Sequence, residues 1–262
     1  MDSLTEIKNI IEEADMVLVG IGEEFSIDPS ELVKRTESET LEREEMEFVM
    51  DSLYLEELEK KDNPDIRSRL KSYHELQELL ENKNYYIVTI CSDDVITVSD
   101  LKQDRIVKPC GTRYLLQCSK GCTDEVIDSE KFRKEITDCF KEGFSEEFIH
   151  EHVPVCEHCH AFMQSNLVTR EHYLEKGYMD DWKRYTMWLQ GTLNKKICIL
   201  ELGVGFRYPT VIRWPFEKIA VLNHKAKFIR VNKDMPQAAK EIADKSVSIR
   251  QDSRDFLAEL IK

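Results

Sequence analysis

Four of the eight cysteines stand in two close pairs with the spacing of a metal site. Cys118 and Cys122 are separated by three residues and Cys156 and Cys159 by two, with 33 residues between the pairs. Each short turn can bring two sulfurs to one ion, and four thiolates favour tetrahedral zinc in a closed, structural site. We therefore predict a zinc site here; four unrelated buried thiols are the alternative. A nearby histidine could replace one thiolate, and the alternative for each histidine is an exposed position on the surface. The three histidines are His152, His158 and His160.

Two glycine pairs follow apolar runs near the two ends of the chain. Gly20 and Gly22 lie in "MVLVGIGEEFS", and Gly203 and Gly205 lie in "LELGVGFRYP". They are four of only nine glycines. Glycine lets the backbone turn sharply and come close to a ligand, and dinucleotides dock at the ends of parallel strands. The double occurrence predicts a nucleotide cleft, whereas a single pair could be no more than a tight turn.

The elements that must position these residues alternate between helix and strand. Short apolar runs are typical of strands buried on both faces, as in a parallel sheet covered by helices. Five such runs are "MVLVG" (16–20), "YYIVTI" (85–90), "KICILELG" (196–203), "IAVLN" (219–223) and "KFIRVN" (227–232). The charged stretch 29–80 predicts two or three helices, and "SRDFLAELI" predicts a closing amphipathic helix. The fold class is therefore α/β.

The domain organisation follows from the cysteine-rich segment that interrupts these strands. That segment predicts an inserted zinc module from residue 118 to about residue 164. After the module, a helix rich in aromatic residues is expected to pack onto the sheet, a groove for a protein substrate being the alternative. Its aromatic residues are Tyr173, Tyr178, Trp182, Tyr185 and Trp188.

Composition excludes several classes of function. The chain has 262 residues, 41% of them hydrophobic, and a formal net charge of −14, which argues against nucleic acid or an anionic membrane as a partner. Its amino terminus is acidic and amphipathic, and no run reaches the ~18 apolar residues that span a bilayer. We expect a cytoplasmic protein. In that reducing compartment the cysteines are expected to be metal ligands, pocket groups or core residues, not disulfide partners.

The order of six segments resembles the sirtuin (Sir2) family of NAD-dependent enzymes over nearly the whole chain. The segments are "VLVGIGEEFS", "YYIVTICSDDV", "IVKPCGTRYLLQCSKGC", "CEHCHAFMQSNLV", "LELGVGF" and "RVN". In that family a Rossmann-like NAD-binding domain and a zinc-ribbon module flank a cleft for NAD and an acyl-lysine substrate. The resemblance implies a zinc-binding module at residues 111–164, inserted into a Rossmann-like NAD-binding domain made of 1–110 and 165–262, with a helical insert at 29–80. The forms "LELGVGF" and "YLLQCSKGC" look most similar to the bacterial branch that contains the macrodomain-linked ADP-ribosyltransferases. The resemblance implies NAD and zinc as cofactors, and NAD, ADP-ribose or a protein as partners.

The motifs that carry sirtuin chemistry are altered in this chain. The family has Gly-Ala-Gly-x-Ser after the first strand, but here Glu24 takes the hydroxyl position, and a carboxylate beside a pyrophosphate is repulsive. In the family's Thr-x-Asn-x-Asp motif, Thr89 and Asp93 match while Cys91 replaces the Asn. Cys110 replaces the His of the family's His-Gly pair.

The resemblance implies a set of site residues. The candidate catalytic residues are Cys110, Cys91 and Asp93. The candidate cofactor-binding residues are Gly20, Ile21, Gly22, Glu24, Thr89, Asp93, Gly203, Val204, Gly205, Asn232 and Asp252. An unperturbed thiol is mostly protonated at neutral pH, so small space-filling groups are the alternative for the two cysteines. A strand or loop cap is the alternative for Asn232 and Asp252.

Three functions remain open at this point. The first is an NAD-dependent protein ADP-ribosyltransferase or deacylase with weakened or altered catalysis. The second is a catalytically inactive pseudoenzyme that binds NAD, ADP-ribose or a partner protein, and the third is a zinc-stapled interaction protein. The retained glycines and cysteines, with substitutions clustered at the reacting end, favour binding or weakened chemistry over ordinary deacetylation. We expect the first function, with the second as the alternative.

Overall fold

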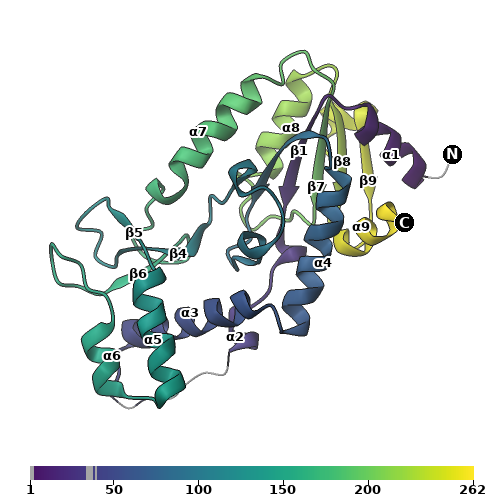
Figure 1. Ribbon diagram of the computed structural model, residues 1–262. Helices are drawn as coiled ribbons and strands as arrows, with labels where there is room; N and C mark the ends of the chain where they lie inside the picture. Colours follow the sequence, from purple (N-terminus) through teal and green to yellow (C-terminus); the bar gives the residue numbers. More distant parts are fainter. Residues whose placement is uncertain (1–2, 34–37, 39) are drawn as a thin grey trace.

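Two sheets organise the molecule (Figure 1). The computed structural model describes residues 3–33, 38 and 40–262. The larger sheet has six parallel strands in the order β3-β2-β1-β7-β8-β9. Its strands are β1 (Met16–Ile21), β2 (Asn84–Thr89), β3 (Ile106–Val107), β7 (Ile197–Leu202), β8 (Lys227–Val231) and β9 (Ser246–Ile249). The predicted α/β fold with a Rossmann-like parallel sheet is confirmed.

Strand β1 is the point at which the order of the large sheet reverses. It pairs with β2 on one side and with β7 on the other, so that Ile21 is level with both Thr89 and Leu202. The chain builds the sheet outward from β1 to β3 and then returns to build from β7 to β9. In open parallel sheets such a reversal leaves a crevice at the carboxyl ends of the strands. Gly22, Gly203 and Gly205 lie at this crevice, whereas Gly20 lies inside β1.

Helices cover both faces of the large sheet, as the uniformly buried strands β1 and β7 require. One core lies against α1, α4 and α9, and the other lies against α7 and α8 (Figure 1). The helices are α1 (Ser3–Glu13), α2 (Pro29–Leu32), α3 (Arg43–Lys60), α4 (Pro64–Leu79), α5 (Glu130–Glu142), α6 (Glu146–His152), α7 (Lys176–Gln190), α8 (Arg213–Leu222) and α9 (Ser253–Ile261). The helices expected within 29–80 and at the closing segment are confirmed.

One predicted strand is wrong. "IAVLN" forms the end of α8, where Phe216 and Ala220 are buried at helical spacing while Val221 and Leu222 are exposed. A short apolar run does not by itself separate a strand from a buried helical segment. Strands β3 and β9 escaped prediction because one has two residues and the other is only half-buried at the edge of the sheet.

The aromatic helix α7 packs onto the large sheet as expected. Tyr185 is buried, and its ring centroid lies 5.4 Å from that of Tyr86 on β2. Trp188 packs against the same tyrosine, and the ring centroids of Trp188 and Tyr86 are 5.7 Å apart. Trp182 meets Tyr185 edge-on, so the aromatic side chains form part of the core on this face.

The small sheet is antiparallel, in the order β5-β4-β6, and lies beside α3, α5 and α6 (Figure 1). Its strands are β4 (Gly111–Cys118), β5 (Val126–Asp128) and β6 (Met163–Leu167). Val49 of α3 shares a core with Leu116 of β4 and Ile136 of α5. The helical insert therefore bridges the two cores, because α3 contributes Val49 to the core of the small sheet and Leu58 to a core of the large sheet, whereas α4 packs with α9. Strand β6 crosses the expected module boundary at residue 164. The expected domain boundaries stay a prediction.

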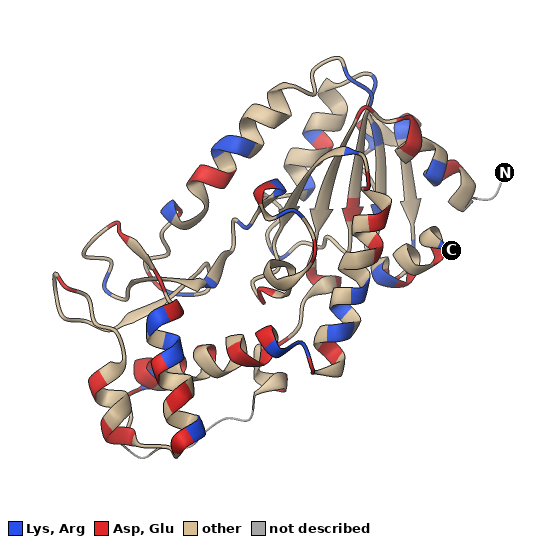
Figure 2. Cartoon of the chain, in the orientation of Figure 1, with Lys and Arg blue, Asp and Glu red and all other residues tan. Residues whose placement is uncertain are grey.

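Helices α4 and α5 carry charged side chains of both signs, whereas α3 is mostly acidic and has basic residues only at its two ends (Figure 2). Many pair one helical turn apart, as Arg43 does with Glu47 at 3.0 Å and Lys60 with Glu56 at 3.7 Å. Among the helices that the structure describes, none combines the length and hydrophobicity that crossing a bilayer requires.

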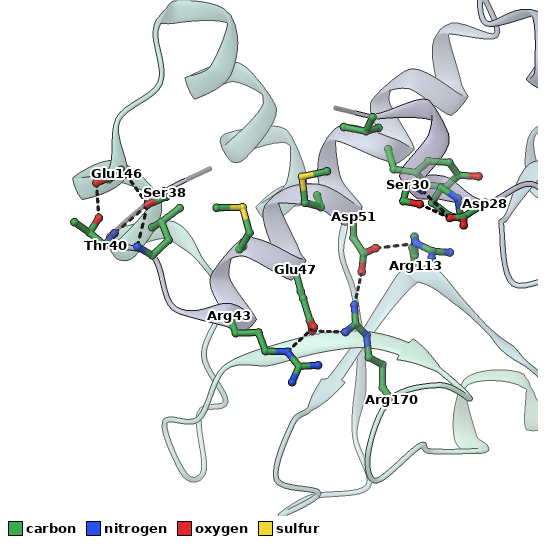
Figure 3. A pocket seen from close by; sticks show the side chains of 16 residues that line it. Asp28, Ser30, Ser38, Thr40, Arg43, Glu47, Asp51, Arg113, Glu146 and Arg170 are labelled. Atoms are coloured by element: carbon green, nitrogen blue, oxygen red, sulfur yellow. Dashed lines mark hydrogen bonds and ion pairs between the residues drawn. The ribbon is translucent and has the colours of Figure 1, made fainter. Parts of the chain in front are cut away.

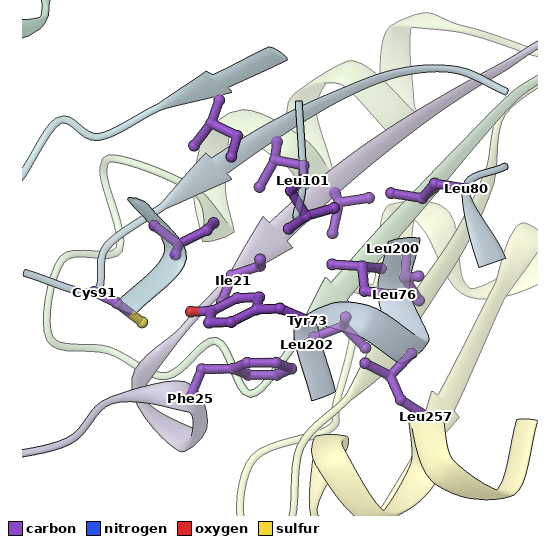
Figure 4. Packing of buried hydrophobic residues seen from close by; sticks show 14 of the residues in the cluster. Ile21, Phe25, Tyr73, Leu76, Leu80, Cys91, Leu101, Leu200, Leu202 and Leu257 are labelled. Carbon is purple, nitrogen blue, oxygen red and sulfur yellow. The ribbon is translucent and has the colours of Figure 1, made fainter. Parts of the chain in front are cut away.

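Two buried tyrosines allow a test of the core around β2. The Tyr54 hydroxyl donates a hydrogen bond to the backbone carbonyl of Asp93. Within the described residues, the Tyr73 hydroxyl has no hydrogen-bond partner (Figure 4). We expect Tyr54→Phe to lower the free energy of unfolding by about 1 kcal/mol, and Tyr73→Phe to leave it unchanged or raise it. Urea unfolding measures both, and equal losses in the two variants would contradict these assignments.

Candidate functional site

A cavity of about 420 Å³ lies at the carboxyl ends of the strands beside the β1/β7 reversal. We call it the strand-end cavity. It is lined by Glu23, Glu24, Gly203, Gly205, Phe206, Arg207, Asn232, Lys233, Asp234 and Met235. Four of these were predicted from sequence: Glu24, Gly203, Gly205 and Asn232. The others were missed, although their positions directly after β1, β7 and β8 were the available signal.

The glycines of this region permit close contact between the loops themselves. A Cβ on Gly22 would lie 2.3 Å from the carbonyl oxygen of Gly203. Gly203 has a φ of +65°, and a Cβ there would lie 2.5 Å from the Cβ of Glu24. A Cβ on Gly205 would lie 3.1 Å from both carboxylate oxygens of Glu23. These three glycines therefore allow the loops after β1 and β7 to touch at the reversal point.

Glu23 directs its carboxylate at the loop that follows β7. One oxygen accepts a hydrogen bond from the backbone amide of Gly205 at 2.7 Å, and the other accepts from that of Arg207 at 3.1 Å. Hydrogen bonds from amides to a carboxylate are stronger than those between neutral groups. This loop thus presents adjacent donors that hold an anion.

Glu24 directs its carboxylate at two further segments. It accepts from the backbone amide of Lys233, after β8, at 2.9 Å and from that of Ser253, at the start of α9, at 2.7 Å. An anion at a helix amino terminus is also stabilised by the helix dipole. Together with the loop after β7, these segments form a cradle of backbone donors suited to anionic groups, such as the phosphates of a dinucleotide.

The walls of the strand-end cavity are fixed by two side chains. Arg213 donates to the carbonyl of Val204 at 3.0 Å and to that of Met235 at 3.1 Å, so it ties the loop after β7 to the loop after β8. Asn232 does the same, donating to the Val204 carbonyl at 3.2 Å and accepting from the Met235 amide at 2.7 Å. Asn232 and Val204 therefore shape the predicted site through the backbone.

A buried ion pair lies beneath these loops. Arg230 of β8 and Glu201 of β7 are 2.6 Å apart, and neither side chain is exposed. Arg230 also contacts Glu217 of α8 at 2.7 Å. Sequence reasoning missed this pair, although a charged residue inside each of two apolar strands was a visible signal. The pair joins neighbouring strands directly below the loops that line the cavity.

The structure places the two candidate catalytic cysteines in different cores. Cys91 belongs to the core against α4 (Figure 4). Its thiol donates a hydrogen bond to the carbonyl of Gly22 at 3.2 Å. Cys110 belongs to the core against α7 and α8. Burial raises the pKa of the Cys91 thiol strongly, and it raises the pKa of Cys110 to about 12. Both thiols keep their protons at neutral pH, which favours the space-filling alternative.

Asp93 pins the loops after β1 and β2 together. Its carboxylate accepts hydrogen bonds from the backbone amides of Ile27 at 2.8 Å and Val95 at 3.1 Å. The side chain is buried, and desolvation raises the pKa of the carboxyl to about 6 despite these hydrogen bonds. Asp93 thus lies next to the loop carrying Glu23 and Glu24 but does not line the strand-end cavity.

The remaining predicted cofactor residues have structural roles. A Cβ on Gly20 would lie 2.6 Å from the side chain of Ile212, so this glycine admits α8 to the sheet. Ile21 and Thr89 are buried at strand ends, and the Thr89 hydroxyl accepts from the backbone amide two residues later. Asp252 caps the amino terminus of α9, where the expected alternative to cofactor binding was a strand or loop cap.

The four paired cysteines converge on one point. Their sulfurs all lie within 4.8 Å of one another, and three of the distances between them are 3.5 Å. A tetrahedron with Zn–S bonds of about 2.3 Å has edges of about 3.8 Å, so the arrangement fits a four-thiolate metal site. Of the described residues, no histidine joins this cluster. Cys118, Cys122, Cys156 and Cys159 therefore form the group that could hold a metal ion.

A second cavity, of about 1270 Å³, lies between α2, α3 and the small sheet. A chain of ion pairs crosses it, in which Arg113 contacts Asp51 at 2.8 Å and Arg170 contacts both Asp51 and Glu47 (Figure 3). The charges in this chain neutralise one another, and they tie α3 to the small sheet.

Comparison with known proteins gives two curated relatives, while no protein-family model matches the chain. A protein ADP-ribosyltransferase of Staphylococcus aureus is 23% identical over 188 residues, covering 70% of this chain and 58% of that protein. A probable bifunctional ADP-ribose hydrolase/ADP-ribosyltransferase of Fusarium oxysporum f. sp. cubense is 24% identical over 170 residues, covering 63% of this chain and 28% of that protein. The chain thus matches less than two thirds of the length of either relative.

Solved structures with the same architecture are Sir2 sirtuins. Sir2Tm bound to a propionylated peptide has a TM-score of 0.53 and 15% identity, covering 100% of this chain and 98% of that one. A Sir2 complex with a p53 peptide and NAD+ gives 0.55 and 14%, covering 98% and 97%. A Sir2 homologue with ADP-ribose gives 0.56 and 12%, covering 100% and 95%. The chain has the sirtuin fold, and the resemblance inferred from its motifs is confirmed.

The raised pKa of Asp93 predicts a pH-dependent contribution to stability. The folded state holds this proton more tightly than the unfolded chain, in which the pKa of Asp is about 3.9. The resulting stabilisation is present at low pH and is lost as the pH rises through about 6. We expect the stability difference between wild type and Asp93→Asn to be about 1 kcal/mol more favourable to wild type at pH 5 than at pH 7.5. Urea unfolding at both pH values measures it, and a pH-independent difference would refute the assignment.

Proposed function

We propose that this chain, which has the sirtuin fold, is an NAD-dependent protein ADP-ribosyltransferase. The observation that carries the proposal is the strand-end cavity, where the β1/β7 reversal places a cradle of backbone amides that holds anions. Both curated relatives bear the name ADP-ribosyltransferase, which supports transfer of ADP-ribose over deacylation. Deacylation is the second candidate, because a solved neighbour with this fold binds a propionylated peptide.

The residues around the cavity suit the parts of NAD. The amides of Gly205 and Lys233, with the side chains of Arg207 and Lys233, would hold the phosphates. Phe206 is 52% exposed on the cavity wall and would stack on the adenine. When bound, NAD supplies an ADP-ribosyl group that can pass to a nucleophile as nicotinamide leaves. The chain's own part is to hold the dinucleotide and orient its ribose toward the acceptor.

The acceptor nucleophile is proposed to come from a protein substrate. Cys91 and Cys110 are buried and protonated, and the carboxylate of Asp93 is engaged by two backbone amides. None of the three is therefore free to attack the ribose. This arrangement agrees with the weakened or altered catalysis expected from the motif substitutions.

Zinc is the proposed ion of the four-cysteine cluster. Four thiolates at tetrahedral spacing select zinc over Mg²⁺ or Ca²⁺, which prefer oxygen ligands. The ion would join the turn after β4 to the turn before β6 and would stabilise the small sheet. It takes no part in the proposed chemistry, because all four positions of a tetrahedron are filled by protein.

Loss of one cysteine of the cluster should remove the metal. We expect the purified protein to contain one equivalent of zinc, and Cys122→Ala to lose it together with several degrees of melting temperature. Cys139→Ala is the matched control, since Cys139 is buried in α5 outside the cluster. Elemental analysis and thermal melting provide the readouts. Retention of zinc by Cys122→Ala, or its loss from the control, would contradict the assignment.

Titration calorimetry with NAD and ADP-ribose tests the proposed site. We expect binding of both ligands with a Kd below about 1 mM, weakened about tenfold or more by Phe206→Ala. Trp214→Ala is the matched control, because Trp214 is 54% exposed on α8 and does not line the cavity.

Nicotinamide release from NAD then separates an enzyme from a binding protein. Release above background that falls in Phe206→Ala supports turnover at this site. Binding without release supports the pseudoenzyme instead, and the absence of binding by either ligand refutes both.

A further inference from the structure

We propose that Glu23 and Glu24 form an internal anion that occupies the phosphate positions of the strand-end cavity and must leave when a dinucleotide binds. The inference rests on the proposed function, because it assigns regulation to the same site. It makes these two glutamates an autoinhibitory contact and explains why the sequence departs from the small hydroxyl residue expected at position 24.

The contact is specific in its geometry. Two adjacent carboxylates take four backbone amides, at 2.7 to 3.1 Å, from three segments that are distant in sequence. Each carboxylate is bidentate, since each of its oxygens accepts one amide. Gly203 and Gly205 leave the space for these side chains, because a Cβ on either would lie 2.5 Å or 3.1 Å from a glutamate atom. The loops after β7 and β8 are therefore shaped around the glutamates.

A phosphate group and these carboxylates compete for the same donors. A backbone amide makes one strong hydrogen bond, so an amide that binds Glu24 is not available to a ligand. Both glutamates also line the strand-end cavity, where their negative charges repel an anionic ligand. An anionic ligand must therefore displace the side chains, whereas a neutral ligand pays no such electrostatic penalty.

The side chains can leave without disturbing the core. Glu23 and Glu24 are half-buried and begin a 3₁₀ turn that ends at Phe25. Phe25 is fully buried and packs on Tyr73, with ring centroids 5.4 Å apart (Figure 4). This aromatic residue anchors the turn, so rotation of the two glutamate side chains frees the amides while the backbone stays in place.

The test compares ligand affinity in variants that differ in one carboxylate. Glu24→Ala removes the side chain that holds Lys233 and Ser253. Glu24→Gln retains its length and its packing on Gly203 but places an NH₂ group against one amide donor, which keeps the test valid if the alanine variant unfolds. Asp234→Asn is the matched control, because Asp234 lines the same cavity and, among the described residues, its carboxylate accepts no backbone hydrogen bond.

Calorimetry with ADP-ribose, inorganic pyrophosphate and adenosine gives the readout. We expect both Glu24 variants to bind ADP-ribose and pyrophosphate about tenfold more tightly than wild type, a factor that corresponds to about 1.4 kcal/mol. Their affinity for adenosine, which carries no phosphate, should be unchanged. Asp234→Asn should change the affinity for ADP-ribose by less than about threefold, since it removes a charge but frees no amide.

The outcomes separate this inference from the proposed function. Equal ADP-ribose affinity in wild type and the Glu24 variants, or an equal gain in Asp234→Asn, overturns the inference and leaves the function standing. Tighter pyrophosphate binding in the Glu24 variants, with no protein binding NAD or ADP-ribose, supports the internal anion and overturns the function. If neither the wild type nor any variant binds an anionic ligand, the inference and the proposed function are both overturned.

Discussion

The parallel pairing of β1 with both β2 and β7 is the constraint on which the rest of the structure depends. A strand paired on both sides with parallel neighbours sends three loops out of the same edge of the sheet. The loops after β1 and β7 come close enough for Gly22 to touch the carbonyl of Gly203. Every donor of the anion cradle lies on a loop or helix start at this edge. Without that pairing, Glu23 and Gly205, which are 182 positions apart in the sequence, would not meet.

Buried polar groups keep this edge rigid. The pair of Arg230 and Glu201 is fully enclosed, and burying two charges costs free energy that their attraction only partly offsets. The pair fixes β7 against β8 directly below the loops that follow these strands. Arg213 holds the same two loops through the carbonyls of Val204 and Met235. A cradle of backbone amides works only if its donors keep their directions. We interpret the enclosed charges as the support for that geometry.

The small sheet is held by chemistry of a different kind. Its core is smaller than either core of the large sheet, and its cysteines gather beside the end of β4 and the start of β6, where Cys118 pairs with Met163. Small structures with limited cores commonly rely on a metal or other cross-link. The ion pairs from Arg113 and Arg170 to Asp51 then connect this sheet to α3 (Figure 3). The packing of α3 and these ion pairs therefore join the small sheet to the rest of the molecule. None of these residues lines the strand-end cavity.

Sequence reasoning succeeded where the signal is local. Runs of a few residues predict the strands of the large sheet, the closing helix and the two cysteine pairs. The reason is that hydrophobic periodicity and metal-ligand spacing are properties of one or two turns of chain. It failed at "IAVLN", where an apolar run of five has no period of its own, and at β9, whose burial is only partial. The sequence indicated the glycine pairs as sites of close approach, but it did not show which groups approach them in space.

What the sequence alone determined was the fold class, the order of its motifs and the cysteines available to bind a metal. Only the tertiary structure decided which groups face one another. It placed Cys91 and Cys110 in separate cores and kept Asp93 out of the cavity wall. It also paired Glu23 and Glu24 with amides of the loops after β7 and β8 and of the start of α9. The physical reason is that these contacts join segments far apart along the chain. Their partners are backbone amides, which every residue other than proline carries and which no sequence pattern distinguishes.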